Sequence, residues 1–116
     1  METTALDFFN TAEREQFLMR HVQIYFEEHG LRGKVAVGFE RDGCECLVRD
    51  GRLLAYYDFE RGEKNLIALF KSAYAVFDYL AWRHLGISKL PLDWPKLNQK
   101  FDEQYSRRAR TAHQQA

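Results

Sequence analysis

The sequence lacks an excess of charge of either sign. Its 116 residues contain 17 lysines and arginines against 17 aspartates and glutamates, so the formal net charge is zero. A general nucleic-acid binder carries a strong positive charge, and a disordered acidic tail requires a long negative run. The balance argues against both classes. A chain of this length buries a single core without disulfides, so we expect one domain over residues 1–116.

Cysteine is scarce. The two cysteines, Cys44 and Cys46, lie two positions apart in an expected strand, which places both side chains on one face. A structural zinc site takes four ligands, and the sequence has no second closely spaced pair of cysteines or histidines. We therefore expect small core residues with reduced thiols, and we expect neither a metal nor a cofactor.

We also expect no targeting segment. Its beginning, METTALDFF, contains neither a basic region nor an apolar run of the length found in secretory signals. The long apolar stretch 65–85 includes Lys71 and Asp78, and each charge is unfavourable by about 2.5 to 3.5 kcal/mol at the centre of a bilayer. We expect a cytoplasmic protein that does not span a membrane.

No recognisable catalytic motif occurs. The sequence contains no Gly-rich phosphate loop and no GxSxG element, and its histidines do not show metal-binding spacing. Two of them, His29 and His84, fall near expected helix C-termini, where a histidine commonly binds the last carbonyl groups. We therefore expect a protein that is not an enzyme.

What the sequence does contain is a mixed α and β pattern. Apolar residues recur at spacings of three and four over 11–29, which is typical of a helix, and Gly30 is placed to end it. Residues 34–60 then alternate between apolar and polar, with turn signals at 41–43 and 50–51. This pattern predicts three consecutive strands in an antiparallel meander.

The stretch from Asn65 to Leu85 would be apolar around nearly its whole circumference as a helix, so we expect a buried central helix that ends at Gly86. Asp93 then caps a final amphipathic helix, with Pro95 tolerated in its first turn. The expected fold is α+β: an N-terminal helix, a three-stranded antiparallel meander, a buried central helix and a C-terminal amphipathic helix.

The alternation divides the meander into two faces. We expect the central helix to be covered by the face made of Val35, Val37, Phe39, Cys46, Val48, Ala55, Tyr57 and Phe59. The other face then points to solvent and is acidic and partly aromatic. We expect a partner to bind there through Glu45, Tyr56, Asp58 and Glu60, with Glu27 and Glu28 behind them. Carboxylates in such a surface can meet a partner's lysines and arginines. The alternative is a solvated face with cross-strand ion pairs.

The end of the chain is basic, with Arg107, Arg108 and Arg110 close together. Such a cluster can contact phosphates, but it also complements the C-terminus of a helix. Tyr105 is expected on the packing side, so the combination of basic and stacking residues that single-strand binders use is incomplete. We expect no direct nucleic-acid binding. An adaptor domain that binds protein or RNA through this helix is the alternative function.

Three features of the second half of the chain occur together. They are the turn Glu60-Arg61-Gly62, the aromatic-rich run Leu69 to His84, and the amphipathic stretch Trp94 to His113 with its basic, histidine-containing end. In this combination the chain resembles small bacterial immunity proteins of polymorphic-toxin and contact-dependent growth inhibition systems. The resemblance implies a non-enzymatic protein that binds the C-terminal effector domain of one cognate toxin, often a nuclease, in the cytosol.

Overall fold

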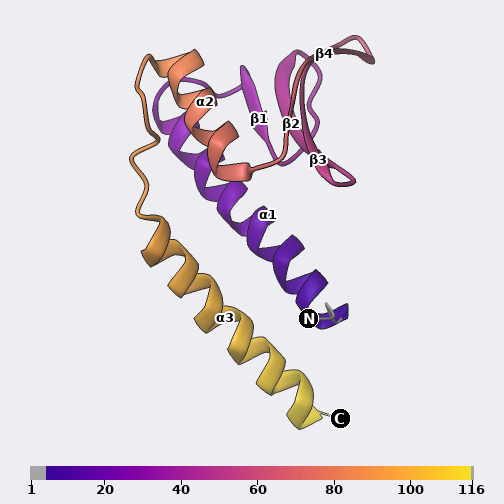
Figure 1. The fold of residues 1–116 in the computed structure, drawn as a ribbon, viewed down its shortest axis with the longest axis vertical. Coiled ribbons are helices and arrows are strands. Elements are labelled where there is room, and N and C mark those ends of the chain that lie inside the picture. Colours follow the sequence, from indigo (N-terminus) through magenta and orange to yellow (C-terminus); the bar gives the residue numbers. More distant parts are fainter. Residues whose placement is uncertain (1–4, 116) are drawn as a thin grey trace. The chain divides into compact units, whose positions relative to one another are not determined.

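The computed structural model describes the backbone of residues 5–115 and the side chains of residues 11–108 (Figure 1). The elements in chain order are α1 (Ala5–Glu28), β1 (Val35–Val37), β2 (Cys44–Asp50), β3 (Leu53–Glu60), β4 (Glu63–Phe70), α2 (Ala73–Leu85) and α3 (Trp94–Gln115). The expected α+β class is confirmed.

The chain separates into two compact units. The sheet unit is Met19–Pro91, and the helix unit contains the described parts of residues 1–18 and 92–116. Helix α1 contributes residues to both units and begins at Ala5, earlier than the expected start at residue 11. The single domain over residues 1–116 stays a prediction.

The sheet has the strand order β1-β2-β3-β4. The pairs β2–β3 and β3–β4 are antiparallel, as expected for the hairpin at residues 50–51, but β1 runs parallel to β2. The expected three-stranded antiparallel meander is therefore wrong in its first pairing and one strand short. Left-handed backbone at Gly38 and Gly43, with φ of 90° and 83°, lets the 38–43 loop turn back and enter β2 in the direction of β1.

The expected helix from Asn65 to Leu85 is a strand followed by a shorter helix. Arg61 and Gly62 both have left-handed φ, 53° and 80°, so they form a tight turn that folds β4 back onto β3. Ser72 then caps α2, because its Oγ accepts a hydrogen bond from the backbone N–H of Ala75 at 3.4 Å.

Two of the expected helix ends are confirmed. Gly86 lies in the left-handed region with a φ of 70° and its N–H donates to the last turn of α2. Asp93 Oδ1 accepts a hydrogen bond from the N–H of Lys96 at 3.1 Å, directly before the first turn of α3. Both ends were recognisable because their capping residues need no tertiary partner.

On β2 and β3, the helices of the sheet unit cover the opposite face from the one expected. On β1 the expectation is confirmed, because Val35 and Val37 are buried and Val37 pairs with Leu47 of the covered face. The C-terminal part of α1 and helix α2 lie on one side of the strands (Figure 1). Leu47, Leu54 and Tyr56 are fully buried on this side, and the ring of Tyr56 lies 6.1 Å from that of Tyr79 on α2. We call this side the helix face.

The other side of the sheet, which we call the open face, carries smaller side chains. Its buried cluster contains Ala36, Cys44, Cys46, Ala55 and Tyr57, with Val48 and Phe59 packed against it. The two cysteines are buried and unpaired, as expected, and burial raises the pKa of the Cys46 thiol. The open face is therefore a small core of its own and not the main helix-packing surface.

In the helix unit, α3 packs against the first part of α1. The rings of Phe17 and Phe101 lie 5.5 Å apart, and the Arg14 guanidinium lies 4.7 Å above the Phe101 ring. Arg14 also donates to Asn98 Oδ1 at 3.0 Å and forms an ion pair with Asp102. The last helix, which the sequence predicted to be amphipathic, makes this contact through one side.

Candidate protein-docking surface

Glu45 on β2 joins the sheet to the end of α2. Arg83 donates from Nε and Nη2 to the two carboxylate oxygens of Glu45, at 3.2 and 2.8 Å. The Tyr56 hydroxyl also donates to Glu45, and His84 Nε2 lies 3.0 Å from Glu45 Oε2 and 3.1 Å from the Tyr56 hydroxyl. A two-point contact between guanidinium and carboxylate holds both groups in a defined orientation. The four side chains therefore clamp α2 onto the sheet.

The environment of the clamp shifts two pKa values. Burial lowers the pKa of His84 below its ordinary value, and the positive charge of Arg83 adds to this effect while Glu45 opposes it. The hydrogen bonds from Arg83 to Glu45 raise the pKa of the guanidinium. Because the polar groups of the clamp bind one another, the arrangement is suited to holding structure and is a poor candidate for catalysis.

Two of the expected partner-binding residues belong to this clamp. Tyr56 is fully buried and Glu45 is half-buried, so the expectation that they lie on a solvent-facing surface is wrong. The physical reason is that both residues are on the helix face, which α2 covers. His84 also differs from expectation, since it contacts Glu45 and Tyr56, whereas His29 Nδ1 lies 2.8 Å from the Tyr25 carbonyl oxygen as predicted.

The remaining expected partner-binding residues differ in exposure. Glu60 is exposed at the β3–β4 turn, whereas Asp58 is half-buried on β3. On α1, Glu28 is exposed, while Glu27 is half-buried and accepts a hydrogen bond from Gln23 Nε2 at 3.2 Å. The partner-binding role of these four residues stays a prediction.

The 38–43 loop covers one end of the open face. The Tyr57 hydroxyl donates to Glu40 Oε2 at 2.6 Å, and Lys64 Nζ lies 3.1 Å from the same oxygen. These hydrogen bonds lower the pKa of Glu40, while burial and the Glu40 contact raise the pKa of Tyr57. The backbone N–H of Arg41 also donates to Cys46 Sγ at 3.4 Å. The loop is thus tied to the sheet at several points.

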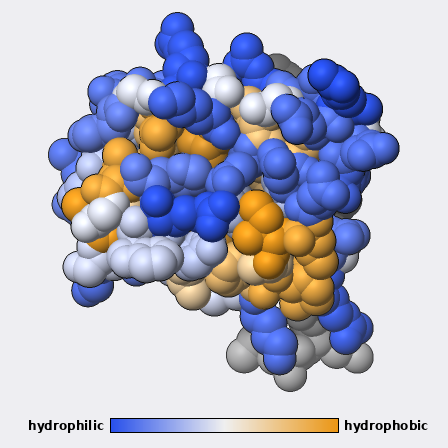
Figure 2. Space-filling model, turned by 90° about the horizontal axis from the view of Figure 1, so that it is seen from above, coloured by the Kyte–Doolittle hydropathy of each residue, from blue (hydrophilic) through white to orange (hydrophobic). Residues whose placement is uncertain are grey.

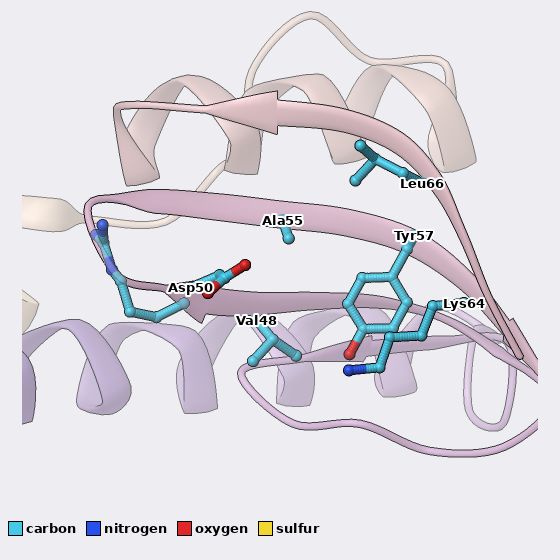
Figure 3. Close-up of a pocket in the computed structure, with 7 residues that line it drawn as sticks. Val48, Asp50, Ala55, Tyr57, Lys64 and Leu66 are labelled. Carbon is cyan, nitrogen blue, oxygen red and sulfur yellow. The ribbon is translucent and has the colours of Figure 1, made fainter. Parts of the chain in front are cut away.

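Beyond the loop, the open face forms a groove of about 380 Å³. It is lined by Val48, Arg49, Asp50, Ala55, Tyr57, Lys64 and Leu66. Figure 3 shows Tyr57 and Lys64 side by side at one end, Asp50 towards the other, and Leu66 on the neighbouring strand. The floor is apolar because Val48 and Ala55 are on adjacent strands with their side chains on the same face. Charged groups stand around that floor.

Comparison with protein-family models, with curated protein sequences and with solved structures found no match.

Large apolar side chains are exposed beside the groove. On β4, Leu66 is 60% exposed and Leu69 is 51% exposed, and both belong to the open face because they pair with Tyr57 and Ala55. Figure 2 shows apolar side chains gathered in patches on an otherwise hydrophilic surface. Contiguous apolar surface of this kind is characteristic of protein-binding sites.

Helix α2 is less buried than expected. Val76, Phe77, Leu80 and Ala81 are buried, but Trp82 is 61% exposed and Tyr74 is 42% exposed. Trp82 is the last member of an aromatic row, with ring centroids 6.1 Å apart between Tyr79 and Trp82 and 5.4 Å apart between Phe70 and Tyr79. The row continues the apolar surface of β4 on the helix face.

Other kinds of site receive little support in the part of the chain that the structure describes. That part contains no group of three histidine, cysteine or acidic side chains placed to hold a metal ion, and none of its helices has the length and apolarity to cross a bilayer. At the basic end, Arg108 pairs with Glu13 at 2.7 Å, and the side chain of Arg110 lies outside the described residues.

Proposed function

We propose that this chain is a non-catalytic immunity protein that binds the effector domain of one cognate bacterial toxin in the cytosol and prevents its action. The resemblance of residues 60–113 to such proteins supports the class of function. The observation that carries the proposal is the exposure of Leu66 and Leu69 beside the groove of the open face.

The groove is suited to a protein partner that presents an apolar side chain surrounded by polar groups. Its floor, Val48 and Ala55, can accept an apolar side chain, and Asp50 and Lys64 at its rim can contact polar groups around that side chain. Protein interfaces commonly combine an apolar anchor with a charged rim in this way. The proposed docking surface is therefore the open face, in place of the acidic face expected from the sequence.

Co-expression with a candidate toxin tests the proposal. The candidate is the C-terminal domain of a large secreted protein where the gene directly upstream encodes one, and this domain should arrest growth when it is expressed alone. Wild-type chain should restore growth, and Val48→Lys should lose protection because it places a charge on the groove floor. In calorimetry with the purified toxin domain, we expect at least about a tenfold weaker Kd.

The matched control is Ile24→Lys, which adds the same charge at an exposed apolar residue of α1, 43% exposed and outside the groove. This variant should protect as well as wild type. Circular dichroism must show that both variants fold. Equal protection by Val48→Lys and wild type would move the interface elsewhere, and no binding by wild type to such a domain would reject the immunity function.

A further inference from the structure

The two edge strands of the sheet, β1 and β4, differ in the hydrogen bonding of their outer backbone groups. At the β1 edge, the Gln23 side chain of α1 accepts a hydrogen bond from the N–H of Val37 at 2.8 Å and donates one to the carbonyl of Val35 at 3.2 Å. At the other edge, β4 is the last strand, and no described element pairs with its outer side. An open edge that also carries exposed leucines is a ready site for another strand.

The turn before β4 determines which backbone groups point outward. In a two-residue turn such as Arg61-Gly62, the flanking pair Glu60–Glu63 is the hydrogen-bonded pair, so alternation directs the N–H groups of Lys64 and Leu66 away from β3. A bulge at Ile67, which has no partner on β3, shifts this alternation by one residue. After the bulge, Leu69 points its N–H outward.

We propose that β4 pairs antiparallel with β4 of a second copy of this chain, which forms a continuous sheet across a twofold axis perpendicular to it. The axis passes between Leu66 and Ile67. Lys64 then lies opposite Leu69 of the second copy, and Asn65 lies opposite Ala68 of the second copy. All residues of β4, Glu63–Phe70, take part. The inference does not rest on the proposed function, although Leu66 and Leu69 belong to both surfaces.

The register follows from the two faces. Paired residues in a sheet must lie on the same face, and the bulge leaves two registers with a long overlap that satisfy this rule. One is the register above. The other is displaced by two residues and would place Lys64 directly opposite Lys71 of the second copy, an unfavourable pair of like charges. The register above contains no like-charge pair and places Glu63 next to Lys71 of the other copy.

A second copy is the occupant that the charges favour. The formal net charge of the chain is zero, so two copies do not repel each other at neutral pH. Leu66, Ile67 and Leu69 are 60, 36 and 51% exposed, and a strand addition would cover them with the same apolar side chains of the other copy. The edge contains no proline, which is one of the features that protect exposed strands.

Solution measurements on the purified chain test the pairing. Sedimentation velocity from about 1 to about 100 μM should show a dimer that forms with concentration, a range suited to a modest interface. Amide hydrogen exchange at Leu66 and Leu69 should slow as the dimer forms, because these N–H groups then donate across the interface. A monomer over the whole range, or a dimer without this protection, would overturn the proposal.

Two substitutions sharpen the test. Leu66→Pro removes an outward N–H, which an edge strand tolerates, and should weaken dimerisation at least about tenfold. Leu69→Lys should do the same by facing Lys64 of the other copy, and adding Lys64→Glu to it should restore the dimer through opposite charges. Ile24→Lys should leave the dimer unchanged. Failure of the double variant to recover dimerisation would overturn the register.

Discussion

The side chain of Gln23 makes the hydrogen bonds to β1 that a neighbouring strand would otherwise make. It is a buried polar residue of α1, 9% exposed, and its amide satisfies one backbone donor and one backbone acceptor of β1. A buried backbone group without a partner is unfavourable by about 1 to 3 kcal/mol. The helix therefore contributes a polar contact, as well as apolar packing, to the position of β1.

The substitution Gln23→Leu should destabilise the protein by about 3 kcal/mol, because the Val35 carbonyl and the Val37 N–H would lose their partner while staying buried. The measurement is the free energy of unfolding in urea. Gln16→Leu, at an exposed glutamine of the same helix, should change it by less than about 0.5 kcal/mol. Equal effects of the two substitutions would show that the amide contacts contribute nothing.

His84 links stability to pH. Its pKa in the folded protein is lowered below 6.5, mainly by burial. As the pH falls below about 6.5, His84 binds a proton more readily in the unfolded chain than in the folded protein. The free energy of unfolding should therefore be highest above about pH 6.5 and decrease below it. His84→Gln should flatten this decrease in urea unfolding between about pH 7.5 and about pH 5.5. The same slope in both proteins would contradict this prediction.

Among the elements, β4 differs most from the prediction made from the sequence, which was a helix. The run from Leu66 to Phe70 is apolar at every position, and such a run fits a strand or a buried helix equally well. The distinguishing signal was Arg61-Gly62 directly after β3. The groove was not predictable for the same reason, since Lys64 and Leu66 on one of its walls come from a strand that was not expected.

Other elements could be predicted because their signals are local. The apolar spacing of α1, the alternation of β2 and β3, the turn at residues 50–51 and the caps at Gly86 and Asp93 all appear in the structure. The parallel pairing of β1 could not, because it depends on the path of the 38–43 loop and on Gln23. Tertiary contacts decide such a pairing.

The β3–β4 turn contains a strained residue. Arg61 is the one non-glycine residue with positive φ among those the structure describes, at 53°. Asparagine tolerates this region better than arginine does, so Arg61→Asn should raise the free energy of unfolding by about 0.5 kcal/mol. Arg52→Asn, in the β2–β3 turn at a residue with ordinary φ, should bring no gain. Thermal unfolding of both variants distinguishes the two cases.

At the scale of the whole molecule, side-chain size separates the two faces of the sheet. Both faces alternate correctly, so periodicity alone did not show which one the helices cover. The helix face carries Leu47, Leu54 and Tyr56. The open face carries the small Cys46 beneath the 38–43 loop and the small Ala55 on the groove floor. Large side chains fill the distance between a sheet and a helix, and small ones allow a loop to lie close. Side-chain volume, as well as periodicity, is needed to predict which face the helices cover.

The closure of β1 by Gln23 limits how many copies could ever join. A sheet with two vacant borders can add molecules without end and grow into a fibril, whereas this one has a single place for growth. Two molecules that meet through β4 use up that place in both. Assembly would therefore stop at a pair.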